Sequence, residues 1–176
     1  MSTQPEQLAD LAARLQGLVE KLTSRVQYLE DVEAIRNLKW EHAQASDDQE
    51  HILERMMPLF TEDVVLDYEH FGRFEGKAAL RQLIANRPFP WAIHYMIPQS
   101  VEVAADGRTA RDVCYLWEPA IQRNPQTGEE EAVWLGGVYQ DEYVKENGQW
   151  KIKKMKLKLE LLSPYTDGWV KTRIRS

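Results

Sequence analysis

Hydrophobic residues recur at steps of three and four through the first part of the chain, from residue 5 to residue 46. They are Leu8, Leu11, Leu15, Leu18, Leu22, Val26, Leu29, Val32, Ile35 and Leu38. This spacing predicts a helix. Because the stretch is longer than a usual globular helix, we expect either a break near residues 28–31, where Asp31 could cap a new helix, or an extension at the N-terminus.

We interpret residues 1–28 as an N-terminal helical extension. A row of leucines along a protruding helix favours contact with a neighbour, so this segment is a candidate packing or oligomer arm. The alternative is a single helix that covers part of the protein's own surface.

The segments that follow are shorter. Residues 48–59 have the pattern of a second helix that ends near Pro58, and residues 63–68 that of a strand. We expect a turn over residues 70–73. Residues 76–86 then predict a third helix, which the proline-rich stretch at residues 87–90 would end.

The rest of the chain has the pattern of strands and turns. The predicted strands cover residues 92–97, 100–104, 109–121, 131–145 and 149–162, and turn residues cluster at 105–108, 124–128 and 146–148. Helices followed by antiparallel strands indicate an α+β fold. The pair Gly136-Gly137 lies inside a long strand, which predicts a bulge or bend and therefore a strongly curved sheet.

Alternation along the strand at residues 109–121 indicates that both faces of the sheet are apolar. Val113, Tyr115 and Trp117 fall on one side, whereas Cys114 and Leu116 fall on the other. If helices cover the concave side, a second subunit would have to cover the convex side. We therefore expect a homo-oligomer.

Length and charge narrow the possibilities. A chain of 176 residues is most simply one domain that can enclose a cavity. The net charge of −6 argues against a nucleic-acid partner or an anionic membrane surface. The single cysteine cannot form an internal disulfide, the N-terminus lacks the apolar block of a signal peptide, and no apolar run approaches the roughly 18 residues of a membrane span. We expect a cytoplasmic protein.

Two residues suggest chemistry. His94 lies in the otherwise apolar stretch of residues 91–97, and Asp47 closes the long helical pattern. A histidine beside a carboxylate can accept and return a proton, because the carboxylate fixes the ring tautomer and stabilises the imidazolium. The pattern alone also permits a core histidine bonded to backbone, and a helix-end turn at Asp47-Asp48.

Several segments resemble one family in their order and spacing. They are residues 29–39, 46–47, 60–65, 93–95, 137–143 and 148–152. Together they resemble the nuclear-transport-factor-2-like superfamily, and within it the SnoaL-like enzymes such as bile-acid 7α-dehydratase, hexachlorocyclohexane dehydrochlorinase and, more distantly, scytalone dehydratase. The resemblance implies a cystatin-like cone, with three N-terminal helices packed on a strongly curved mixed or antiparallel sheet. The SnoaL-like domain would span residues 29–165, followed by a C-terminal tail at residues 166–176.

The resemblance also implies roles for individual residues. Asp47 and His94 match the pair that abstracts a proton in the eliminating enzymes, and Tyr68 matches a strand tyrosine of the bile-acid enzyme. His42 stands where those enzymes have a tyrosine or lysine, five residues before the aspartate, which is a departure from the pattern. Read without the family, Tyr68 is a half-buried strand residue and His42 could face solvent.

We expect the cavity to suit a flat, apolar substrate. The residues predicted to bind it are Trp91, Tyr115, Trp117, Trp134 and Lys158. Lys154 and Lys156 are further candidates for the basic residue that relatives carry on the final strand, although alternation with apolar residues also fits a solvated strand face. His42, Asp47 and His94 are acceptable metal ligands, but their spacing matches no ligand pattern, and the resemblance implies neither a metal nor a cofactor.

These observations predict a cofactor-independent lyase that removes water, or less readily HCl, from a hydrophobic ring compound such as a steroid or polyketide. An isomerase or cyclase with the same base is one alternative. Another is a non-catalytic binding or structural protein, such as the β subunit of a ring-hydroxylating dioxygenase. The resemblance favours a homotrimer, and a dimer is the alternative.

Overall fold

A single unbroken helix forms the N-terminal quarter of the protein in a computed structural model that describes residues 3–124 and 127–175. Helix α1 runs over Gln4–Asp47. Of the two alternatives for this stretch, the break near residues 28–31 is absent, because the helix is continuous there. Asp31 caps no new helix, because its carboxylate instead accepts hydrogen bonds from Lys145 Nζ at 2.5 Å and Trp150 Nε1 at 2.9 Å, where the helix reaches the body of the protein.

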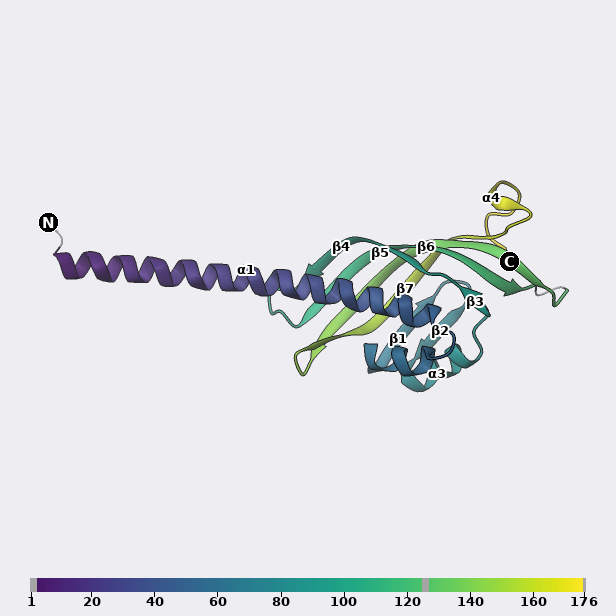
Figure 1. Ribbon diagram of the computed structural model, residues 1–176, viewed down its shortest axis with the longest axis horizontal. Coiled ribbons are helices and arrows are strands. Elements are labelled where there is room, and N and C mark those ends of the chain that lie inside the picture. Colours follow the sequence, from purple (N-terminus) through teal and green to yellow (C-terminus); the bar gives the residue numbers. More distant parts are fainter. Residues whose placement is uncertain (1–2, 125–126, 176) are drawn as a thin grey trace.

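The remaining helices are short. After α1 come α2 (Ile52–Met56), a 3-10 turn (Met57–Leu59) and α3 (Gly76–Ala85). The predicted second helix therefore begins later than expected, because the side chain of Asp48 accepts a hydrogen bond from the backbone of His51 and holds a turn there. A fourth helix, α4 (Gly168–Lys171), was not predicted and lies in the C-terminal tail (Figure 1).

Seven strands form one mixed sheet. They are β1 (Phe60–Tyr68), β2 (Gly72–Glu75), β3 (Trp91–Ala92), β4 (Tyr95–Val103), β5 (Thr109–Arg123), β6 (Glu130–Glu146) and β7 (Gln149–Pro164). Their order is β2-β1-β7-β6-β5-β3, and β4 also pairs with β5. Among the strand pairs of the described residues, β1 and β7 are parallel and the others are antiparallel. The turn expected over residues 70–73 includes the first residues of β2, and part of the turn expected over residues 124–128 lies outside the described residues.

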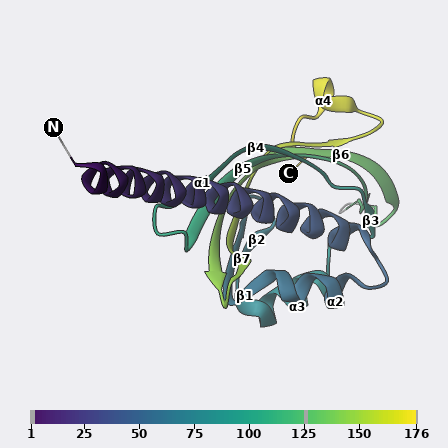
Figure 2. The ribbon, with the colours of Figure 1, turned by 60° about the vertical axis from the view of Figure 1, so that its left-hand side comes forward.

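The predicted irregularity at Gly136-Gly137 is confirmed. The pairing of β6 with β7 shifts register between these two glycines. A Cβ atom added at Gly137 would lie 2.5 Å from the carbonyl oxygen of Lys158, so the two strands approach closely only because this residue has no side chain. The resulting long, curved strands are visible in Figures 1 and 2.

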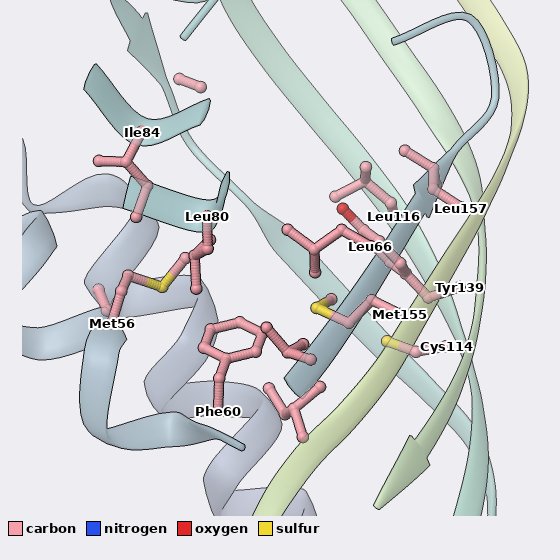
Figure 3. Close-up of a cluster of buried hydrophobic side chains, with 14 of the residues drawn as sticks. Met56, Phe60, Leu66, Leu80, Ile84, Cys114, Leu116, Tyr139, Met155 and Leu157 are labelled. Atoms are coloured by element: carbon pink, nitrogen blue, oxygen red, sulfur yellow. The ribbon is translucent and has the colours of Figure 1, made fainter. Parts of the chain in front are cut away.

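The hydrophobic core fills the space between the concave face of the sheet and the helices. Figure 2 shows α1 crossing the sheet, with α2 and α3 beneath it. In the close-up of Figure 3, Met56, Leu80 and Ile84 come from the helices and face Leu116, Tyr139 and Leu157 on the strands. Burying these apolar side chains is the main source of stability for this layer. No helix in the described residues is long and apolar enough to cross a membrane.

The convex face of the sheet is apolar and is only partly covered within one chain, where Trp169 and Tyr165 of the C-terminal segment contact Trp117 and Trp134. Tyr115 is 49% exposed, and the indole of Trp117 stacks on Trp134 with ring centroids 5.3 Å apart. The alternation expected along β5 is therefore present, with Cys114 and Leu116 buried on the concave side. A second subunit over the convex face stays a prediction.

Candidate active site

His94 lies where one strand stops and the next begins, and not on a strand as expected. Ala92 in β3 pairs with Ala120, and Tyr95 in β4 pairs with Trp117. The same register holds on both sides of the gap, so His94 lies opposite Glu118 of β5. Its backbone N–H does not bond to β5. It donates instead to the carboxylate of Asp47, at 3.0 Å from Oδ1 and 3.3 Å from Oδ2.

The imidazole of His94 contacts the same carboxylate. Nδ1 lies 2.7 Å from Oδ1 of Asp47, the last residue of α1. Two contacts to one carboxylate fix both the backbone and the ring, which leaves Nε2 as the nitrogen available for chemistry. The neighbouring Asp48 makes the helix-end contacts, with His51 and Arg55, that the sequence also allowed for Asp47.

A second carboxylate lies on the other side of the ring. Oε2 of Glu118 is 3.5 Å from Nε2 of His94, and the Glu118 side chain is only 4% exposed. Burial alone would lower the pKa of His94, but the hydrogen bond that its ring donates to Asp47 and the charge of Glu118 outweigh it and raise that pKa. Burial raises the pKa of Glu118, and the charge of Asp47 adds to this rise while His94 opposes it.

These groups open into a cavity of about 150 Å³ beneath the helices. Its wall is mostly apolar, and includes Ile52, Met56, Leu80, Leu83, Phe89 and Leu135. The polar groups in the wall are few, and include His42, Tyr68, Arg87, His94 and Glu118. An apolar pocket with a few convergent polar groups of altered pKa is the usual form of a catalytic site.

His42 and Tyr68 both line this cavity. The His42 side chain is buried, and its Nδ1 has no hydrogen-bond partner. Burial, reinforced by the charges of Lys39 and His94, holds the pKa of His42 well below its usual range, so this ring is neutral near pH 7. Tyr68 donates a weak hydrogen bond to the sulfur of Met155 at 3.7 Å, and burial raises its pKa. Both residues thus have a position from which they can hydrogen-bond a substrate.

The predicted substrate-binding residues do not line this cavity, although Trp117 borders a second hollow with His94 and Tyr95. The predicted residues are Trp91, Tyr115, Trp117, Trp134 and Lys158, none of which is in the wall of the cavity described above. The aromatic residues project from the convex face, since side chains alternate along a strand and the concave positions are taken by neighbours such as Leu116. Lys158 is exposed and pairs with Glu160 at 2.5 Å. Lys154 likewise pairs with Glu142 on the surface.

Arg87 and Glu118 are the site residues that sequence reasoning missed. Arg87 follows α3, and its guanidinium contacts the side chain of Gln49 and the carbonyl oxygen of Ile84 while its Nε has no partner. It supplies the positive charge that was expected from the final strand. Glu118 could have been found by extending the alternation of Cys114 and Leu116 by one more step along β5.

Metal ligation does not fit this geometry. Asp47 and Glu118 contact opposite nitrogens of one imidazole, so the three groups do not converge on a point. Across residues 3–124 and 127–175, no group of three or more acidic, histidine or cysteine side chains is arranged to hold a metal ion.

Comparison with known proteins agrees with this architecture. The family model for the SnoaL-like domain matches residues 27–156. No curated protein sequence matches the chain. A solved structure of a type-3 hexachlorocyclohexane dehydrochlorinase from Novosphingobium barchaimii LL02 is similar, with a TM-score of 0.68, 17% identity, and coverage of 80% of this chain and 93% of that chain.

Two structures from Novosphingobium aromaticivorans are also similar. One is described provisionally as a scytalone dehydratase, with a TM-score of 0.69, 21% identity, and coverage of 80% of this chain and 91% of that chain. The other is a nuclear-transport-factor-2-like protein with a cystatin-like fold, with a TM-score of 0.56, 23% identity, and coverage of 78% and 87%. These likenesses confirm the predicted α+β, cystatin-like fold. Because the family model covers most of its length, the chain belongs to the SnoaL-like domain family.

Proposed function

We propose that this protein is a lyase that takes a proton from a carbon atom next to a carbonyl group and expels a hydroxyl group from the neighbouring carbon. The observation that carries the proposal is the His94 Nδ1 to Asp47 Oδ1 contact of 2.7 Å, with the rest of the imidazole in a largely apolar cavity. A carboxylate bound to Nδ1 makes Nε2 the basic nitrogen and stabilises the imidazolium once it has accepted a proton.

The size of the cavity narrows the substrate class. A volume of about 150 Å³ is comparable to engineered cavities that accept benzene, and it is smaller than the roughly 300 Å³ at which drug-sized pockets begin. We therefore propose a substrate with a single six-membered ring. We propose this in place of the steroid or polyketide predicted from the resemblance, because the volume matches one ring more closely than a fused-ring system.

Proton removal next to a carbonyl group creates negative charge on oxygen, which must be stabilised. The cavity offers the Arg87 guanidinium for this purpose, and the Tyr68 hydroxyl as a neutral donor. The half-buried cation has most to contribute, because charges interact more strongly where water is partly excluded. In this proposal Arg87 replaces the basic residue that relatives carry on the final strand, and His42 lines the pocket as a neutral ring.

Two simple compounds test the proposal. Cyclohexanone in D₂O reports proton abstraction through exchange of its α-hydrogens, measured by proton NMR, and 3-hydroxycyclohexanone reports elimination through the absorbance of cyclohexenone. We expect His94→Gln and Asp47→Asn to reduce both rates by about 10²-fold or more. His51→Gln is the matched control, because His51 is an exposed histidine outside the cavity.

Each outcome is informative. Wild-type rates no higher than those of buffer for both compounds would contradict the proposal, as would full rates in the two variants. Exchange of the α-hydrogens in both compounds, with no loss of water from 3-hydroxycyclohexanone, would favour the isomerase alternative.

A further inference from the structure

Glu118 is not needed to orient His94. Asp47 already holds the ring through Nδ1 and holds its backbone N–H. Glu118 contacts the opposite nitrogen at 3.5 Å, which is beyond a good hydrogen bond, and its Oε1 has no partner. A carboxyl group that is nine-tenths buried, half unpartnered and at the cavity wall is costly unless it has a task.

The charges around the ring indicate what that task is. Asp47 and Glu118 flank one imidazole in a buried site, and two carboxylates beside a neutral ring would repel each other without compensation. One proton shared between Nε2 and Glu118 removes this conflict. The directions of the pKa changes agree, because both His94 and Glu118 bind a proton more readily than usual.

We infer that Glu118 is the general acid of the proposed elimination, and that it exchanges one proton with His94 in a closed cycle. The reaction begins with Glu118 protonated and His94 neutral. His94 Nε2 removes the proton from the substrate carbon, and the electron pair of that C–H bond forms the new double bond. The C–O bond then breaks, and the departing hydroxyl takes the proton of Glu118 to leave as water.

His94 and Glu118 return to their starting protonation states without exchanging a proton with solvent. After water has formed, the imidazolium carries a proton on Nε2 and Glu118 is ionised, 3.5 Å away. Transfer of that proton from His94 to Glu118 restores both groups, so the number of protons on the protein is unchanged by each turnover. This inference rests on the proposed function, but its test can fail separately.

Glu118→Gln distinguishes the acid from the base. The amide keeps the volume of the side chain and cannot deliver a proton. We expect enone formation from 3-hydroxycyclohexanone to fall by about 10²-fold, because protonation of the leaving group is lost. Exchange of the α-hydrogens of cyclohexanone should fall by much less, since His94 and Asp47 are unchanged. His94→Gln should abolish both, and Glu102→Gln, an exposed glutamate paired with Arg111, should affect neither.

Equal losses of exchange and elimination in Glu118→Gln would overturn the inference, and so would no loss of elimination.

A second measurement, the titration of His94, needs no turnover. Ring ¹⁵N shifts should show the pKa of His94 falling by roughly one unit or more in Glu118→Gln, because a neighbouring negative charge has been removed. An unchanged His94 titration contradicts proton sharing, even where neither compound is a substrate. Glu118→Asp provides a charged variant should the amide fail to fold.

A separate observation concerns the first part of α1, residues 4–30, which we call the arm. The arm stands clear of the body of the protein (Figures 1 and 2), and its large apolar side chains are between 44% and 61% exposed. Leu8, Leu15, Leu22 and Leu29 recur every seven residues. Leu11 and Leu18 stand three residues after the first two of them. This is the a and d pattern of a coiled coil over two heptads, and it continues at the following a positions, whereas Arg25 occupies d of the third heptad.

The helix that packs against this row of leucines, the leucine seam, can be inferred from the other helices of the chain and from the charges beside the seam. The described residues contain no other helix that could pair along the arm, since α3 has ten residues with Leu80 and Ile84 buried, and α2 and α4 are shorter. Arg14 and Lys21 occupy positions beside the seam. In an antiparallel pair these basic residues would face one another, whereas in a parallel pair their stems face Val19 and Val26 of the other helix.

We propose that the arm forms a parallel coiled coil with the arms of further copies of this chain. The test is the molar mass in solution, measured by light scattering after gel filtration. Wild type should be an oligomer, and Leu15→Glu with Leu18→Glu should lower its mass. Ala13→Glu with Gln16→Glu adds the same charge on the outer face of the helix and should leave the mass unchanged.

Direction is tested with Leu8→Cys. In a parallel coil the two introduced thiols meet and form a disulfide under mild oxidation, whereas in an antiparallel coil Leu8 would lie near Leu29, about 30 Å from its counterpart. Cys114 is buried and does not compete. A monomeric wild type, an unchanged mass in the double leucine variant, or the absence of the disulfide would each overturn the proposal.

Discussion

Two histidines in one cavity have opposite electrostatic surroundings. The pKa of His42 is held well below its usual range, chiefly by burial, whereas the Asp47 hydrogen bond and Glu118 raise the pKa of His94 despite its burial. One ring therefore stays neutral while the other can take up a proton. Such separation of pKa values within one site is how proteins assign different roles to residues of the same type.

The low pKa of His42 predicts loss of stability in acid. In the unfolded chain His42 binds a proton below about pH 6.5. In the folded chain the pKa of His42 is lower, so the ring binds a proton only at lower pH. The contribution is thus present above pH 6.5 and is lost as pH falls, by up to about 1.4 kcal/mol per pH unit. Urea unfolding between pH 5 and 8 should show a shallower dependence in His42→Asn than in wild type. His51→Gln should match wild type, and equal slopes for all three proteins would contradict the prediction.

Individual site residues could be predicted to different degrees. Asp47 and His94 are 47 positions apart in the sequence, so only the resemblance to a family indicated their contact. Glu118 became recognisable through the register of β5 against β3 and β4, which brings it opposite His94. The predicted aromatic residues do not line the cavity, and the sequence could not show this, because alternation shows which side chains share a face and does not show which face is concave.

At the scale of elements, a buried ion pair fixes α1 against the sheet. Lys39 of α1 pairs with Asp141 of β6, both side chains are at most 1% exposed, and the ammonium lies 4.0 Å from the ring centroid of Tyr139. Asp112 is close by, and burial together with Asp141 raises its pKa to about 6. Because Lys39 precedes His42 by one helical turn, this pair also sets the position of α1 over the cavity.

Removing one partner of the pair should be more harmful than removing both. Lys39→Met leaves Asp141 buried without its cation, and we expect a loss of about 3–5 kcal/mol in the free energy of unfolding. Lys39→Met with Asp141→Leu should recover most of that loss, because an apolar pair carries no buried charge. Urea denaturation measures all three proteins. A double variant as unstable as the single one would show that the pair is not what the single change disrupts.

The glycine pair in β6 provides a second prediction. A Cβ at Gly137 meets the Lys158 carbonyl oxygen at 2.5 Å and a Leu157 methyl at 2.9 Å, whereas the nearest atom to one at Gly136 is 3.5 Å away. Gly137→Ala should therefore destabilise the fold by about 1–3 kcal/mol. Gly136→Ala is the matched control and should be much milder in thermal unfolding. Equal losses for the two would contradict the role assigned to the close approach.

Most elements could be predicted because their patterns are local. The bulge followed from two adjacent glycines in a long strand, and the long strands followed from alternation. The continuity of α1 could not, since it depends on Asp31 bonding Lys145 and Trp150 more than a hundred residues away. The short strand β2 was also missed, because four residues beside a turn carry too little pattern to distinguish a strand from its turn.

At the scale of the whole molecule, the sheet and helices enclose a cavity whose size no pattern in the sequence reports. Its volume is the space left over when many side chains pack, and each of them contributes a little. The family model and the similar structures establish the fold that encloses it, but at identities of 17–23% they leave its dimensions to this chain's own residues.

This volume leads to the last prediction. Cyclohexanone should raise the melting temperature, since a ligand at 100 times its Kd stabilises the folded state by about 2.7 kcal/mol. 1-Decalone, which has two fused rings, should raise it far less, because a volume of about 150 Å³ suits one ring better than two. Leu83→Ala shortens a side chain in the cavity wall and so enlarges the cavity, which should let 1-decalone stabilise the variant. Equal effects of the two ketones on wild type would mean that the cavity widens to admit fused rings, and the single-ring proposal would then be withdrawn.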